Sequence, residues 1–255
     1  MSVQQLDYPG AKILMEIETQ VEAAFRIHAC EKEPWTVAMI ERMQPGDVLY
    51  DIGANVGSYT LVAAARGLSV VAIEPGYENY SRLCHNLAMN VDPGQGLDPP
   101  QSWLRRVVAI HGALADKNGL AWLDFSDLRA GAGSHVFGSP QPLKFHRQPV
   151  ATWALDDLVF ALGLVAPTHI KIDVDGAEML VLAGAHRTLQ GGPWPEGVEP
   201  HASPRELLIE IELEREREIV ETLTGMGWRA SERYAERNGK QIPNICYGLF
   251  TRADA

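Results

Sequence analysis

The chain has 255 residues, a formal net charge of −11 and a hydrophobic fraction of 46%. This length and apolar content suit one globular α/β domain, alone or with a small addition, and they disfavour a disordered chain. The acidic balance, without a basic stripe, argues against a nucleic-acid partner because phosphates would be repelled.

Three isolated cysteines, Cys30, Cys84 and Cys246, have no C-x-x-C spacing. This pattern disfavours a disulfide framework or a zinc site and is typical of a reducing compartment. The sequence shows no segment of signal-peptide type and no apolar run long enough to span a bilayer. It therefore predicts a cytoplasmic protein without a membrane partner, and no feature predicts an oligomeric state.

Residues 1–45 are expected to form a flap and a helix that pack on the core. Apolar and polar residues alternate over 13–17 and again over 23–27. A period of two predicts the two strands of a hairpin, although a helix over 13–24 also fits the composition. A helix over 34–43 follows, with proline at its first position.

The segment 48–60 combines an apolar run, a Gly-x-Asn-x-Gly turn and a helical start. It predicts a buried parallel strand, a tight loop and a helix N-terminus, and its glycines suit a backbone that turns sharply beside a ligand. A second apolar run, 69–73, ends in Glu74, about twenty residues after the first glycine. At that spacing, an acid on the neighbouring strand accepts hydrogen bonds from a ribose diol. These features predict a nucleoside-bearing cofactor at the carboxyl ends of a parallel sheet.

The loop departs from the dinucleotide fingerprint G-x-G-x-x-G, in which backbone amides meet a pyrophosphate. Ala54 and Asn55 follow Gly53, no basic residue lies in the loop, and the G-x-x-x-x-G-K-[S/T] phosphate loop is also missing. Asp51, just before the loop, would repel a phosphate and suits a ligand that carries an amino group and a sulfonium. That ligand is S-adenosyl-L-methionine.

The rest of the chain continues as alternating strands and helices. Residues 118–153 differ, with extended pieces around a glycine-rich turn, and predict an insertion over the carboxyl edge of the sheet that selects the substrate. The remaining expected elements are a helix over 77–89, a loop over 92–100, a strand over 106–111, a helix from 155, a strand over 169–173, a helix over 177–189, a strand over 206–211, a helix over 213–224 and an antiparallel pair, 228–234 with 245–251.

Three motifs share the features of one known family: Asp51-Ile-Gly-Ala-Asn-Val-Gly57, Ile73-Glu74-Pro75 and Ile170-Lys-Ile-Asp-Val-Asp-Gly-Ala-Glu178. Together, over residues 33–211, the chain resembles the FkbM family of class I S-adenosylmethionine-dependent methyltransferases. The resemblance implies a doubly wound, Rossmann-like α/β fold with seven mostly parallel strands, an N-terminal β flap and an inserted cap. The methyltransferase domain would cover 46–255. The resemblance also implies methyl transfer, most readily to a hydroxyl oxygen of a small-molecule or glycan acceptor.

The predicted cofactor site gathers around the strand ends. In class I methyltransferases the turn after the third strand contacts adenine, which is what the resemblance implies for Ala113 and for Asp116, whose carboxylate would accept from the exocyclic amine. The full set of expected cofactor contacts is Asp51, Gly53, Asn55, Gly57, Tyr59, Thr60, Glu74, Pro75, Ala113, Asp116 and Asp173.

Asp173 ends the central strand, at the switch point where ligands bind in open α/β sheets. We expect it to orient the methionine amino group or the acceptor. With Asp175 and Glu178 it also forms a carboxylate trio compatible with a hard divalent cation. A metal is not favoured, because Asp175 equally suits a helix N-cap and Glu178 a first helical turn. Candidate bases are Asp173, His146 and His135, although His135 also fits an exposed loop histidine.

Three other interpretations stay open. The methyl acceptor can be a nitrogen or a protein side chain, which keeps the enzyme class. A nicotinamide-dependent oxidoreductase is a second possibility, against which the broken fingerprint counts. The third is a non-catalytic nucleoside-binding module.

Overall fold

A seven-stranded sheet forms the centre of the protein, which a computed structural model describes over residues 2–90, 106–133, 136–137, 146–193 and 203–252. The strands run in the order β12 (Trp228–Tyr234), β15 (Ile245–Arg252), β11 (Glu206–Glu212), β10 (His169–Ile172), β3 (Val48–Ile52), β4 (Ser69–Glu74) and β5 (Val107–His111). From β11 to β5 all neighbours are parallel, and β15 is antiparallel to both of its neighbours. The predicted mostly parallel sheet of seven strands is confirmed.

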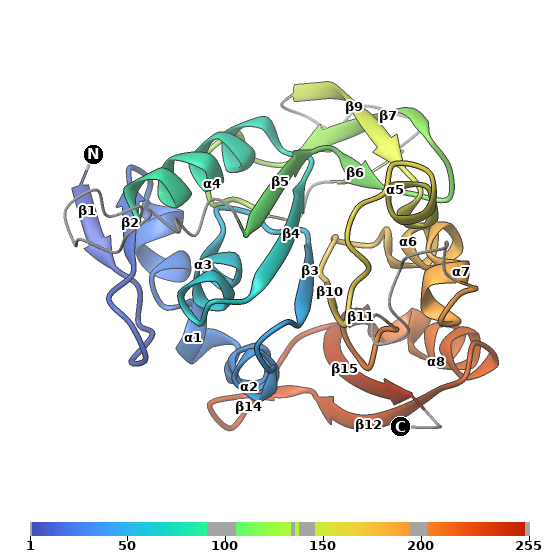
Figure 1. The fold of residues 1–255 in the computed structure, drawn as a ribbon. Helices are drawn as coiled ribbons and strands as arrows, with labels where there is room; N and C mark the ends of the chain where they lie inside the picture. Colours follow the sequence, from blue (N-terminus) through green and yellow to red (C-terminus); the bar gives the residue numbers. More distant parts are fainter. Residues whose placement is uncertain (1, 91–105, 134–135, 138–145, 194–202, 253–255) are drawn as a thin grey trace.

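Helices cover both faces of this sheet (Figure 1). One face carries α1 (Ala29–Lys32), α2 (Pro34–Arg42), α3 (Ser58–Ala65) and α4 (Tyr77–Met89), and the other α5 (Leu155–Phe160), α6 (Glu178–Gly184), α7 (His186–Leu189) and α8 (Glu216–Gly225), which follows the 3-10 turn η4 (Leu213–Arg215). Leu49 and Tyr50 of β3 enter opposite buried clusters, as alternate residues of a strand do. Burial on both faces explains why the core strands are continuous apolar runs. Among the described residues, no helix is long and apolar enough to cross a membrane.

The N-terminal flap agrees with the prediction in one of its two arms. The strand predicted over 13–17 is β2 (Leu14–Ile17), and it pairs antiparallel with β1 (Ser2–Gln5). The second arm, predicted over 23–27, is wrong because Glu22–Arg26 (η1) is a helical turn. Thr19 Oγ1 accepts from the Glu22 amide at 3.1 Å, and Glu22 Oε2 accepts from the Thr19 amide at 2.9 Å. This capping box is written in the sequence as Thr-x-x-Glu and overrides the apparent alternation.

The insertion forms a second sheet. Within the described residues, its order is β6 (Ala113–Leu114), β9 (His146–Trp153), β7 (Gly119–Phe125) and β8 (Val136–Phe137). Figure 1 shows these green to yellow strands at the top of the view, next to β5 and α5. The extended pieces expected over 118–153 are therefore present, whereas the loop expected over 92–100 lies outside the described residues.

The helix predicted over 177–189 is divided into α6 and α7 at Ala185. Gly184 lies at the break, where a Cβ atom would overlap the carbonyl oxygen of Ala115. The prediction that Asp175 caps this helix is wrong. Ala177 precedes α6, and Asp175 has a left-handed φ of 52°. The chain therefore turns once more after β10 before the helix begins.

Candidate active site

A cavity of about 720 Å³ lies at the carboxyl ends of β3, β4, β10 and β11. The wall is completed by residues of η1 and of the strands β7 and β8 of the insertion. Arg237 of β13 (Glu236–Arg237), which pairs with β14 (Lys240–Gln241), also lines the cavity. The volume falls in the range of small-molecule sites, and the position is that of ligands in open α/β sheets.

The loop after β3 needs its glycines for packing. Gly53 has a φ of 82°, and a Cβ atom there would overlap the backbone carbonyl of Asp173. Gly57 has a φ of 89°, and a Cβ atom there would overlap the Leu83 side chain. Tight packing on the neighbouring strand end and on α4 thus explains both glycines, and Asn55, with a φ of 51°, is left on the cavity wall.

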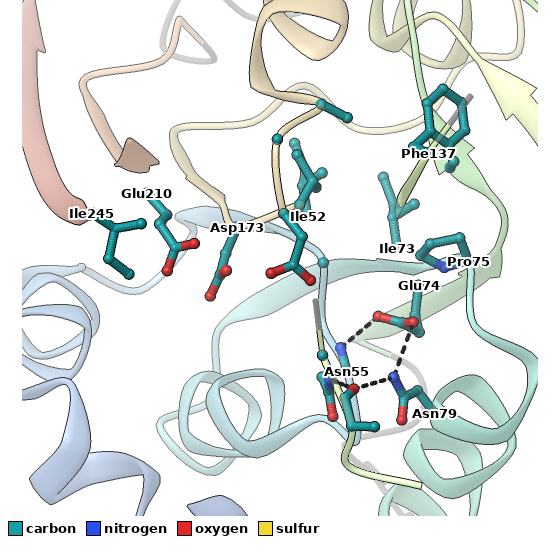
Figure 2. A pocket seen from close by; sticks show the side chains of 18 of the residues that line it. Ile52, Asn55, Ile73, Glu74, Pro75, Asn79, Phe137, Asp173, Glu210 and Ile245 are labelled. Carbon is teal, nitrogen blue, oxygen red and sulfur yellow. Dashed lines mark hydrogen bonds between the residues drawn. The ribbon is translucent and has the colours of Figure 1, made fainter. Parts of the chain in front are cut away.

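Glu74, at the end of β4, accepts hydrogen bonds from three donors, of which Figure 2 shows Asn55 and Asn79. Its Oε2 accepts from the Asn55 amide at 2.8 Å, and its Oε1 accepts from the Gly76 amide at 2.8 Å and from Asn79 Nδ2 at 3.4 Å. Burial raises the pKa of Glu74 to about 7, although these hydrogen bonds oppose the rise. A carboxylate oxygen has two lone-pair sites, and the described residues donate one hydrogen bond to Oε2.

Lys171 is a buried cation between two carboxylates. Its Nζ donates to Asp173 Oδ2 at 2.9 Å and lies 4.0 Å from Asp51 Oδ1. Burial alone would raise the pKa of Asp173, but Lys171, Lys32 and Arg26 outweigh it and hold that pKa below its usual value. Asp173, whose side chain is 24% exposed, therefore presents an ionised carboxylate to the cavity, suited to a cationic group such as an amine.

Glu210 of β11 is a second acid beside Asp173. The parallel register pairs Ile172 with Ile209, so the next residues are neighbours at the edge of the sheet (Figure 2). Burial, and then the charge of Asp173, raise the pKa of Glu210 to about 8, although the Tyr247 hydroxyl donates to its Oε2 at 2.6 Å. Neighbouring carboxyls with pKa values pushed apart are typical of acid–base sites. Glu210 was not among the residues predicted from the sequence. The pattern that could have indicated it is the pair of acids, Glu210 and Glu212, at the end of the apolar run of β11.

The structure separates the predicted cofactor residues into two groups. Those that line the cavity are Gly53, Asn55, Glu74, Pro75, Ala113 and Asp173. Asp51, Gly57, Tyr59, Thr60 and Asp116 are not among its lining residues.

Each residue away from the wall has an identifiable environment. Asp51 shares the sheet face of Leu49 and accepts from the Thr60 hydroxyl of α3 at 2.6 Å. The Tyr59 hydroxyl donates to the carbonyl of Ala29 at 2.9 Å. Asp116 is exposed after β6. Asp51 thus lies behind the cavity wall, 4.0 Å from Lys171 Nζ, and does not line the cavity.

Of the two histidines considered as bases, His146 is exposed at the start of β9, and His135 lies outside the described residues. Among the described residues, the three carboxylates considered for a metal are not a set whose oxygens lie within 4.8 Å of one another. Glu178 Oε1 instead accepts from the Gly176 amide at 3.1 Å. Within the described ranges, the set of three residues whose potential ligand atoms all lie within 4.8 Å of one another is Asp7, His28 and Glu31, none of which lines the cavity.

Comparison with known proteins gives consistent matches. A sequence profile described as "Methyltransferase FkbM domain" matches residues 51–219. The chain is 26% identical over 171 residues to a hexuronic acid methyltransferase of Haloferax volcanii, covering 67% of this chain and 63% of that protein. It is 27% identical over 170 residues to the 31-O-demethyl-FK506 methyltransferase of Streptomyces tacrolimicus, covering 60% and 63%. The matches thus span 63% of the length of these relatives.

The fold is also similar to a solved structure. The crystal structure of magnesium protoporphyrin IX methyltransferase from Synechocystis PCC 6803, with bound S-adenosylmethionine, superposes with a TM-score of 0.50 at 12% identity. The match covers 93% of this chain and 86% of that one. It shows the class I methyltransferase fold.

Proposed function

The chain belongs to the FkbM methyltransferase family, and from that premise we propose that it transfers a methyl group from S-adenosyl-L-methionine to a hydroxyl oxygen of a small-molecule or glycan acceptor. The observation that carries the proposal is the succession of Glu74, Asp173 and Glu210 along one cavity (Figure 2). Two relatives are named for a hexuronic acid and for 31-O-demethyl-FK506 as methyl acceptors, and these names support an acceptor of this class.

The residues on the cavity wall fit an adenosyl ligand. Glu74 keeps a lone pair for a ribose hydroxyl, and the small side chain of Ala113 leaves room for a flat base on the same side. The ionised Asp173 suits the methionine amino group, and Gly53 and Asn55 would lie under the amino-acid end. When bound, S-adenosyl-L-methionine supplies an electrophilic methyl group.

The protein must align the acceptor oxygen with the methyl carbon and sulfur, and remove the hydroxyl proton. Asp173 is better suited to anchoring than to proton removal, because its pKa lies below the usual value. The cap residues Leu123 and Phe137 also line the cavity, and Phe137 lies near Pro75, at the Glu74 end (Figure 2). The 118–153 insertion would therefore contact parts of the acceptor that reach over the cofactor, and in this way contribute to acceptor selection, while the reacting hydroxyl would lie farther along the cavity, beyond Asp173.

Calorimetric titration with S-adenosylmethionine, S-adenosylhomocysteine and NAD tests the cofactor. We expect saturable binding of both adenosyl ligands, weakened by Glu74→Ala and unaffected by Glu78→Ala, an acid of α4 away from the cavity wall. If neither adenosyl ligand binds the folded protein, the proposal is refuted, and binding of NAD would favour an oxidoreductase.

A panel of acceptors tests the transfer itself. Hexuronic acid glycosides, neutral sugars, a macrolide and a peptide are incubated with labelled S-adenosylmethionine, and mass spectrometry locates the methyl group. A methyl group found on oxygen supports the proposal. A methyl group found on nitrogen contradicts the proposed hydroxyl acceptor but leaves methyl transfer standing. Binding without turnover on any acceptor would favour a non-catalytic module.

A further inference from the structure

We propose that Glu210 takes the proton of the acceptor hydroxyl during methyl transfer, while Tyr247 holds its carboxyl in place. This inference rests on the proposed function, since it concerns the acceptor side of the same cavity. Three features support it: the place of Glu210 in the sheet, the orientation of its carboxyl, and the charges around it.

Glu210 lies at the end of the cavity opposite Glu74. In the sheet order, β10 and β3 separate β11 from β4. A ligand whose ribose meets Glu74 and whose amino group meets Asp173 therefore extends across the strand ends toward β11. Glu210 is the acid that follows Asp173 in this direction, and Ile245 beside it closes the wall (Figure 2).

The carboxyl of Glu210 is oriented and has one open oxygen. Its Oε2 accepts from the Tyr247 hydroxyl at 2.6 Å. Tyr247 is itself fixed, because it is 1% exposed and its ring lies 4.9 Å from the ring of Trp35. Over the part of the chain that the structure describes, Oε1 has no hydrogen-bond partner, yet it is not a fully buried atom. Oε1 is therefore the oxygen available to a hydroxyl in the cavity.

The charges around Glu210 come from several elements, and they suit a proton acceptor. Burial raises its pKa most, followed by the charge of Asp173, and the result of about 8 is close to a working pH. The groups that face it are Asp173 after β10, Asp175 in the following loop, Glu33 before α2 and Tyr247 on β15.

The reaction forms one oxygen–carbon bond, breaks one carbon–sulfur bond and moves one proton. The acceptor hydroxyl gives its proton to the ionised Oε1 of Glu210 as its oxygen bonds to the methyl carbon, and the carbon–sulfur bond breaks with its electron pair kept by sulfur. The products are a methyl ether, S-adenosylhomocysteine and neutral Glu210, which returns its proton to solvent. A sulfonium nearby favours the ionised carboxylate before the reaction.

Infrared difference spectroscopy of the full chain tests whether Glu210 faces the reacting sulfur. The band of its neutral carboxyl is followed with pH in the presence of S-adenosylhomocysteine or S-adenosylmethionine. We expect a titration that is absent in Glu210→Gln and retained in Glu212→Gln, its neighbour on β11. Because the two ligands differ by the sulfonium charge, the midpoint should be lower with S-adenosylmethionine by about one pH unit or more.

Equal midpoints with the two ligands would overturn the inference, and so would a titration that survives Glu210→Gln. Should Glu210→Gln fail to fold, Tyr247→Phe serves instead. Because the Tyr247 hydroxyl donates to Glu210 Oε2, its loss should raise the midpoint of the Glu210 titration. An unchanged midpoint would count against the hydrogen bond between Tyr247 and Glu210. Calorimetric binding of both ligands to the same samples distinguishes failure of the proposed function from failure of the proposed role of Glu210. Binding of both ligands without a difference between their midpoints overturns only the role of Glu210. With an acceptor found in the panel, Glu210→Gln should lower kcat about 100-fold or more, and retained kcat would overturn the role.

Discussion

The affinity for S-adenosylhomocysteine should depend on pH through Glu74. A carboxylate accepts hydrogen bonds from a ribose diol more strongly than a neutral carboxyl, which must also place its own proton. Burial raises the pKa of Glu74 to about 7, so a proton must leave before or as the ligand binds. Affinity should therefore be highest above pH 7 and fall as the pH is lowered.

The size of the effect follows from the pKa of Glu74, which is about 7. About half of this group is ionised at pH 7 and about one tenth at pH 6, so Kd should roughly double at pH 7 and rise about tenfold at pH 6 relative to its high-pH value. Asp173 adds no slope, since its lowered pKa keeps it ionised throughout. In Glu74→Gln, Kd should be flat over this range and about tenfold weaker at high pH, because a charge-assisted hydrogen bond is lost.

The assay is calorimetric titration at pH 6, 7 and 8, in pairs of buffers with different heats of ionisation. Wild type should release about half a proton per ligand bound at pH 7. Glu78→Gln, which changes an acid outside the cavity wall, should keep the wild-type slope. A flat Kd in wild type, or an unchanged slope in Glu74→Gln, would refute the argument.

Three further predictions concern the framework of the site. Gly53→Ala should lower the free energy of unfolding by more than about 3 kcal/mol, because its φ is 82° and a Cβ would overlap the Asp173 carbonyl. Gly46→Ala, with a φ of 94° but open space, should cost only about 1 kcal/mol, and equal losses in urea denaturation would contradict this reasoning. Lys171→Met leaves the buried carboxylate of Asp51 and the partly exposed carboxylate of Asp173 without their cation and should cost about 3 kcal/mol. A loss below about 1 kcal/mol in the same assay would count against that pairing. Thr19→Ala should cost about 1 kcal/mol in thermal unfolding, with Thr19→Ser restoring most of it, because the hydroxyl caps η1.

Local pattern was enough to predict most of the core. The apolar runs of β3, β4 and β10, the helix of α4 and the proline that starts α2 are each encoded within a few neighbouring residues. The same holds for Glu74, because a strand that follows a glycine turn and a helix must return beside the first strand, with its terminal acid at the same edge. The sequence by itself therefore determined the sheet and the place of Glu74, the acid that we propose binds the cofactor.

Which side chains meet in the cavity was decided only by the tertiary structure. Glu210 lies beside Asp173 because β10 and β11 pair in parallel in one register, and nothing near Glu210 in the sequence encodes that pairing. Asp51 faces α3 rather than the cavity because it precedes the end of β3, and the pleat turns successive side chains to opposite faces. Sheet order and register act between residues far apart in the chain, and this long-range geometry determined the composition of the site.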